Sequence, residues 1–167
     1  MRSAVVYYSL EGNTRLAAQS LAARLGAKLF EVEPVKAYPI KGLAKFFHGG
    51  KDSAFGRLPQ IKSLVMDPSS YDLVVLALPM WAGKAAAPIN TFLKGRSFGK
   101  AKVAFVISSA SGDAGSCAKD LAGKVGRSVA DIPVLSLKNP AQMNKAELGA
   151  QIDAFADRLQ NSAGGAF

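Results

Sequence analysis

The sequence predicts an α/β fold, a three-layer sandwich in which a five-stranded parallel sheet is covered by helices on both faces. Strand-like apolar runs alternate along the chain with segments of helical periodicity, the pattern of consecutive βαβ units. Two of the runs, residues 71–78 and 102–108, are almost continuously apolar, which is typical of strands buried on both faces of a parallel sheet. Right-handed crossovers should place the loops that follow the strands at one end of the sheet.

The N-terminal half of the chain carries two expected strands around one helix. Residues 2–8 are mostly apolar and predict the first strand. Residues 13–25 have helical apolar spacing and stop before Gly26, a common helix terminator. Residues 28–33 alternate apolar and polar side chains, so we expect a half-buried strand that ends at Pro34.

The C-terminal half alternates strands and helices more regularly. In chain order we expect a strand over 71–78, a helix over 88–93, a strand over 102–108, a helix over 114–125, a strand over 133–137 and a helix over 145–159. Pro88 suits a first helical turn, and Gly126 suits a helix end. Leu148, Ile152 and Phe155 share one face of the last helix, as expected for packing against a sheet.

The size of the chain fits a single domain. Its 167 residues would bury about 70% of the surface of the unfolded chain. We expect one domain over residues 1–161 and a disordered tail over 162–167. Residues 35–62 read as an irregular segment with a short helix near 41–47. One cysteine and one histidine exclude an internal disulfide framework and a multi-histidine metal site.

The loop after the first strand is the most informative stretch. It is polar, contains a glycine and leads directly into a helix, whose free N–H groups and macrodipole favour an anion. We interpret it as a phosphate site, and the alternative is an ordinary capped helix. The candidate residues are Ser9, Leu10, Glu11, Gly12, Asn13 and Thr14.

Two further loops follow the buried strands. The first combines an apolar wall with small residues against which a flat ligand can lie: Pro79, Met80, Trp81, Ala82 and Gly83. The second is small and polar and offers hydroxyls and backbone donors: Ser109, Ala110, Ser111 and Gly112. Trp81 could instead fill the core, so each loop is a modest signal alone.

Together the three loops resemble those of the flavodoxin-like family of FMN proteins. The first matches the family pattern Ser-x-Thr-Gly-Asn-Thr, with Glu11 in the usual threonine place. The second resembles its Pro-x-Trp-x-Gly segment, and the third resembles the loop on the other side of the flavin ring. The resemblance implies the strand order 2-1-3-4-5 and FMN as cofactor. It also implies that residues 9–14 bind the phosphate, while 79–83 and 109–112 flank the ring. Because a carboxylate should not face a phosphate, we expect the Glu11 amide to bind and its side chain to point away.

Two functions are compatible with this resemblance. The first is electron transfer with a redox protein partner or a small-molecule electron acceptor. The alternative is an NAD(P)H-dependent FMN reductase of quinones or nitro compounds. A phospho-acceptor signalling domain, which shares the fold, is excluded because Tyr8, Ser9, Leu78 and Pro79 stand where its acidic residues are needed.

The charge of the chain indicates which classes of partner it could attract. The formal net charge is +9, and much of the excess lies in the basic segment 36–62, where Asp52 is the one carboxylate. Its cations are Lys36, Lys41, Lys45, Lys51, Arg57 and Lys62. Without a nucleic-acid motif, this field would steer an acidic partner or an anionic substrate. The apolar run 73–82 is too short for a membrane span, and no secretory signal is recognisable, so we expect a cytoplasmic protein. The oligomeric state stays open.

Overall fold

A computed structural model describes residues 1–39 and 50–161 of the chain. Its main strands are β1 Ser3–Tyr7, β2 Lys28–Glu31, β3 Leu73–Trp81, β5 Lys102–Ser109 and β6 Val134–Lys138. They pair in parallel in the order β2-β1-β3-β5-β6, which confirms the order 2-1-3-4-5 when the five are counted along the chain. The expected helix near 41–47, Lys41, Lys45 and the expected tail over 162–167 lie outside the described residues.

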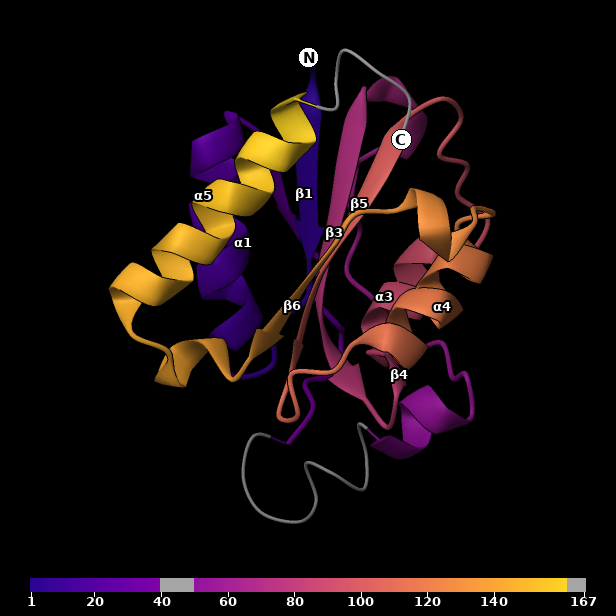
Figure 1. Ribbon diagram of the computed structural model, residues 1–167. Coiled ribbons are helices and arrows are strands. Elements are labelled where there is room, and N and C mark those ends of the chain that lie inside the picture. Colours follow the sequence, from indigo (N-terminus) through magenta and orange to yellow (C-terminus); the bar gives the residue numbers. More distant parts are fainter. Residues whose placement is uncertain (40–49, 162–167) are drawn as a thin grey trace.

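Helices cover both faces of the sheet (Figure 1). They are α1 Asn13–Leu25, α3 Ala87–Leu93, α4 Gly115–Lys124 and α5 Lys145–Asn161. The alternation of strand side chains explains the layers. Val5 and Val75 lie in the core cluster with residues of α1 and α5, whereas Val6 and Leu76 lie in the cluster with residues of α3 and α4. The predicted three-layer α/β architecture is therefore confirmed.

The expected helices and strands agree with the observed ones to within a few residues, but β3 is longer than expected. It runs to Trp81 and turns back into β4, Lys84–Ala85, which pairs with it in antiparallel fashion. Ala82 and Gly83 form the turn with φ values of 49° and 75°. Two positive φ values define the type I′ hairpin turn, for which Asn-Gly is the usual sequence signal. Ala-Gly is not such a signal, so the hairpin was not predicted. Three short 3₁₀ helices were also not expected: η1 Pro68–Ser70, η2 Val129–Asp131 and η3 Pro140–Gln142.

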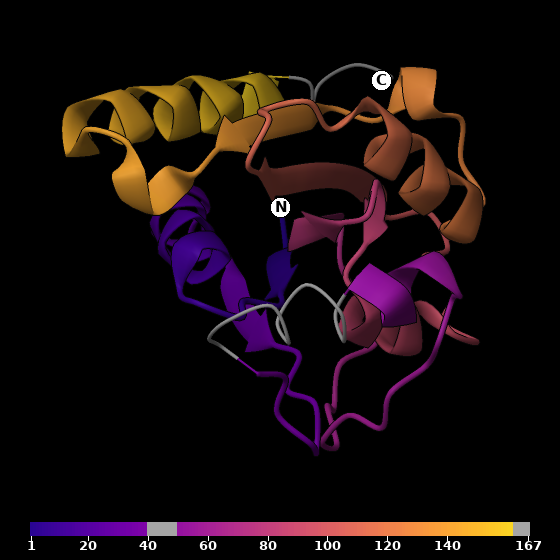
Figure 2. The same ribbon diagram turned by 90° about the horizontal axis from the view of Figure 1, so that it is seen from below.

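The loops that follow the parallel strands meet at one end of the sheet, the lower end in Figure 1 and the near side in Figure 2. Residues 50–54 are helical and lie at this same end, beside α3 (Figures 1 and 2). The chain therefore brings the three predicted loops and part of the basic segment 36–62 together.

Candidate functional site

A cavity of about 170 Å³ opens at the carboxyl ends of β1, β3, β5 and β6. All three predicted loops contribute to its wall. The predicted residues that line it are Ser9, Leu10, Glu11, Asn13, Thr14, Pro79, Met80, Trp81, Ser109 and Ala110. Ligand sites of open parallel sheets are expected at this edge, so the position of the cavity agrees with the topology.

The remaining predicted residues do not line the cavity. They are Gly12, Ala82, Gly83, Ser111 and Gly112. All five lie in turns or bends that shape the loops, and four of them have positive φ values: Gly12, Ala82, Gly83 and Gly112. A positive φ suits glycine best, and three of these four residues are glycines.

The first loop is closed by its own hydrogen bonds. The Gly12 amide donates to Ser9 Oγ at 3.1 Å, and the Gly12 carbonyl accepts from the Leu16 amide at 3.0 Å. Gly12 caps α1 in the left-handed conformation with φ of 93°, and no acidic residue lies in the first helical turn. The α1 N-terminus therefore lies at the cavity wall, where Asn13 and Thr14 line it. The first amides of a helix have no partner within the helix and the dipole end is positive there, an arrangement that can attract an anion.

A buried hydroxyl pair joins the first loop to the sheet. Thr14 Oγ1 and Ser108 Oγ lie 2.8 Å apart, and both residues are buried. Each hydroxyl carries one hydrogen, and a single hydrogen closes the bond between them. The second hydrogen is available to a ligand, because both residues line the cavity.

Aromatic rings hold the apolar wall in place. The Trp81 ring makes edge contacts with Tyr8 at 5.5 Å and with Tyr38 at 5.1 Å between ring centroids. The Tyr38 hydroxyl donates to Asp52 Oδ2 at 2.9 Å. Burial raises the pKa of both tyrosines, so both are neutral phenols near pH 7. Trp81 is half-buried: it packs at the edge of the core and also borders the cavity.

The third loop depends on Gly112. Its amide donates to Ser109 Oγ at 2.9 Å, and its carbonyl accepts from Ser136 Oγ at 2.5 Å. Its φ is 82°, and a Cβ at this position would lie 3.2 Å from Lys138 Cβ. The close approach to β6 explains why a glycine is needed here.

Three residues of the cavity wall were not predicted. They are Ser108, Asn139 and Pro140. Ser108 lies within β5, one residue before the predicted third loop, whereas Asn139 and Pro140 follow β6. The Asn139 amide donates to the Ser109 carbonyl at 3.0 Å. The predicted strand order could have indicated Asn139 and Pro140, because it places β6 beside β5 and so brings the loop after β6 next to the predicted third loop.

Other chemistry is poorly supported in the part of the chain that the structure describes. Cys117 is fully buried, and burial raises the pKa of its thiol to about 12, so it is a core residue and no nucleophile. Within residues 1–39 and 50–161, no group of three or more His, Cys, Asp or Glu side chains could hold a metal ion. The same residues include no helix with the length and apolarity needed to cross a membrane.

Comparisons with known proteins agree with this geometry. A family model described as Flavodoxin matches residues 2–155. The structure is similar to that of a candidate flavoprotein from Bacteroides eggerthii DSM 20697, at 25% identity and a TM-score of 0.72 over 93% of this chain and 98% of that chain.

Two further solved structures share the fold. One is a flavoprotein in complex with FMN from Lactobacillus acidophilus NCFM, at 21% identity and a TM-score of 0.65 over 84% of this chain and 95% of that chain. The other is a Fusobacterium nucleatum flavodoxin bound to flavin mononucleotide, at 13% identity and a TM-score of 0.59 over 97% and 99% of the two chains. No curated protein matches the sequence.

Proposed function

This chain belongs to the flavodoxin family, and we propose that it binds FMN in the cavity at the carboxyl end of its sheet and acts in electron transfer. The family match supports the cofactor, as do the FMN complexes of the two similar structures. The observation that carries the proposal is that one cavity is lined both by a polar loop at a helix N-terminus and by an apolar wall with Trp81.

The donor set of the cavity fits the phosphate of FMN. Residues 9–14 offer backbone amides at a helix N-terminus and the side chains of Ser9 and Asn13. The Thr14–Ser108 pair has one hydroxyl hydrogen left for an acceptor. Glu11 is exposed, which leaves room for its carboxylate to stay away from a bound phosphate.

The opposite part of the cavity fits a flat, largely apolar ring. Met80 and Trp81 would border the isoalloxazine, and Ser109 and Ala110 of the third loop would face its heteroatoms. When bound, FMN supplies one-electron and two-electron transfer through this ring. The residues of the chain orient the cofactor, exclude water from the apolar wall and set the polarity around it.

An electron carrier is the function we favour. The chain has no Gly-x-Gly-x-x-Gly fingerprint for binding a dinucleotide. An electron carrier needs no such motif, because it does not bind NAD(P)H. The net charge of +9 favours the alternative of an NAD(P)H-dependent FMN reductase, because a positive field attracts the anionic nucleotide. In either role we expect the protein in the cytoplasm.

One spectroscopic experiment tests the proposal and separates the two roles. The purified protein is reconstituted with FMN, and its visible spectrum is followed anaerobically as NADH or NADPH is added. We expect a yellow protein that neither nucleotide bleaches within minutes. Rapid bleaching would assign the reductase role, and a protein that takes up no FMN would contradict both.

A further inference from the structure

A surface of exposed apolar and basic side chains lies beside the site. Phe55 is 74% exposed and Leu58 is 44% exposed, although both are large apolar residues. We call this surface the Phe55 face and define it by the exposed residues Lys51, Phe55, Arg57, Leu58, Lys94 and Lys124, together with the buried Leu93, which lines a cavity within it. A large exposed aromatic beside a second apolar side chain is a common mark of a protein interaction surface.

A second cavity gives the Phe55 face a concave shape. It has a volume of about 280 Å³ and lies between Leu58 and Leu93, with Lys94 and Lys124 at its wall. Its wall also includes Asn90, whose Oδ1 accepts from Lys124 Nζ at 2.8 Å. The space suits a protruding apolar side chain of a partner, which a flat lipid surface does not offer.

The Phe55 face keeps a positive charge after its internal ion pairs are counted. Asp52 pairs with Arg57 at 3.5 Å, and Asp120 pairs with Lys124 at 2.5 Å. These two carboxylates balance two cations, while Lys51 and Lys94 are exposed and add charge. An apolar centre with a basic rim is complementary to an acidic protein surface that carries an apolar side chain.

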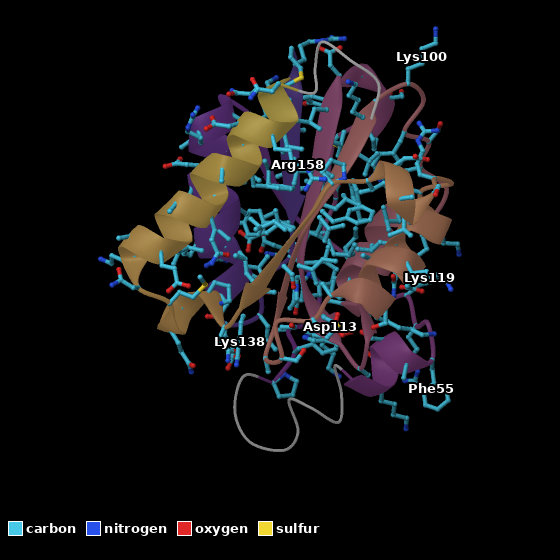
Figure 3. The ribbon with its side chains drawn as sticks, in the orientation of Figure 1. Phe55, Lys100, Asp113, Lys119, Lys138 and Arg158 are labelled. Atoms are coloured by element: carbon cyan, nitrogen blue, oxygen red, sulfur yellow. The ribbon has the colours of Figure 1, made fainter. Side chains whose placement is uncertain are left out.

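The position of the Phe55 face links it to the cofactor cavity. Figure 3 shows Phe55 at the same end of the molecule as Asp113 and Lys138, which lie in and next to the loops of the site. The Asp52 carboxylate accepts from the Tyr38 hydroxyl, and the Tyr38 ring contacts Trp81 in the cavity wall. A molecule bound to the Phe55 face therefore lies next to the aromatic wall of the site.

We propose that the Phe55 face docks an acidic protein partner that exchanges electrons with the bound cofactor, an inference that rests on the proposed function. The partner places an apolar side chain between Leu58 and Leu93, and its carboxylates face Lys51 and Lys94. One electron passes from the reduced cofactor to an oxidised one-electron acceptor of the partner, which is reduced. Electrostatic attraction sets the association rate, and the apolar contact lengthens the lifetime of the complex.

Two haem proteins of opposite surface charge test this proposal. Cytochrome b5 serves as the acidic acceptor and cytochrome c as the basic one. The FMN-loaded protein is reduced, and haem reduction is followed by stopped flow from low to high salt. Binding of the oxidised proteins is measured separately by calorimetry. We expect cytochrome b5 to bind more tightly and to react at least tenfold faster at low salt, with a rate that falls steeply as salt rises.

Two variants locate the docking surface. Lys51→Gln combined with Lys94→Gln should slow the low-salt reaction with cytochrome b5 roughly tenfold and flatten its salt dependence. Phe55→Ser should weaken calorimetric binding about fivefold and leave the salt dependence unchanged. The matched control is Lys100→Gln with Val129→Ser, two exposed positions away from the Phe55 face, and it should stay within about twofold of the parent.

Several outcomes would overturn the docking proposal. Variants of the Phe55 face that behave like the control, or a preference for cytochrome c, would contradict it. Binding to phosphatidylserine vesicles that Phe55→Ser abolishes would assign the face to a membrane surface, and loss of a dimer in that variant would assign it to a second copy of the chain. The proposed function fails differently, with no FMN spectrum or no electron transfer to either haem protein.

Discussion

The predicted phosphate loop, residues 9–14, and the β3–β4 hairpin, residues 79–85, border the same cavity, but the chain holds them differently. The loop is tied to the sheet by the buried Thr14–Ser108 pair and leads into α1, whose inner face lies in the core. The hairpin leaves the buried part of β3 at half-buried residues and turns through Ala82, a non-glycine residue with φ of 49°.

This difference teaches how one cavity can combine two requirements. A phosphate needs donors in fixed positions, since each donor must already point at the anion when it arrives. A flavin ring needs an apolar wall that adapts to a large flat surface. Within the residues that the structure describes, the Trp81 ring is supported by edge contacts with Tyr8 and Tyr38 and makes no hydrogen bond. We therefore expect the phosphate loop to tolerate substitution worse than the hairpin.

Among substitutions measured at neutral pH, the largest expected effect belongs to the buried hydroxyl pair. Thr14→Val keeps the shape of the side chain but leaves the Ser108 hydroxyl without its partner. An unpaired buried hydroxyl costs about 1–3 kcal/mol of the free energy of unfolding. The same change should weaken FMN binding about tenfold, because a donor to the phosphate is lost. Urea denaturation and FMN titration measure the two effects. Thr14→Ser is the control and should restore most of both, and a Val variant as stable as the parent would contradict the account.

The next largest effect concerns Gly112 in the third loop, residues 109–112. Gly112→Ala places a Cβ at a φ of 82° and 3.2 Å from Lys138 Cβ. We expect the free energy of unfolding to fall by about 2 kcal/mol from backbone strain and crowding. The matched control is Gly149→Ala in α5, where a Cβ meets nothing within 4 Å, and it should stabilise the protein slightly. Equal stabilities of the two variants in urea would mean that Gly112 is not constrained.

Alkaline pH should lower the free energy of unfolding through Cys117, a buried thiol of the core beside the hairpin. Cys117 lies in the core cluster that Trp81 packs against, and its pKa is raised from 9.0 to about 12, mainly by burial. Below pH 9 the thiol is protonated in both the folded and the unfolded state, so its contribution to the free energy of unfolding is fully present. Between pH 9 and 12 the unfolded thiol ionises first, and stability falls by about 1.4 kcal/mol per pH unit. Cys117→Ala should remove this part of the alkaline slope in thermal melts from pH 8 to 11. An unchanged slope would show that the thiol does not cause it.

The smallest expected effect is a gain at the hairpin turn. Ala82→Gly replaces a non-glycine residue at positive φ in a type I′ turn and should raise the free energy of unfolding by about 0.5–1 kcal/mol. For a domain of this length that is a rise of roughly 1–4 °C in the melting temperature. Calorimetry of the two proteins measures it. A lower melting temperature would mean that Ala82 is not strained and that the hairpin is held as firmly as the phosphate loop.

The regular part of this molecule was predictable from the sequence, whereas its close contacts were not. Continuous apolar runs such as 102–108 can only be buried strands here, and their alternation with helices left one common architecture. The β3–β4 hairpin was missed because Ala82 carries no turn signal. Asn139 was missed because a contribution to the cavity from the loop after β6 depends on tertiary distance and not on any local pattern. The roles of the predicted site residues in binding FMN stay predictions.

The affinity for FMN compared with riboflavin tests the central claim most directly, because the two ligands differ only in the phosphate. Trp81 is the one tryptophan of the chain, so quenching of its emission reports ring binding for both ligands. We predict that riboflavin binds about a hundredfold more weakly than FMN, the loss of roughly two charged hydrogen bonds. Asn13→Ala should weaken FMN and leave riboflavin unchanged. Equal affinities for the two ligands, or tryptophan emission that neither changes, would contradict a phosphate loop and an aromatic wall that share one flavin.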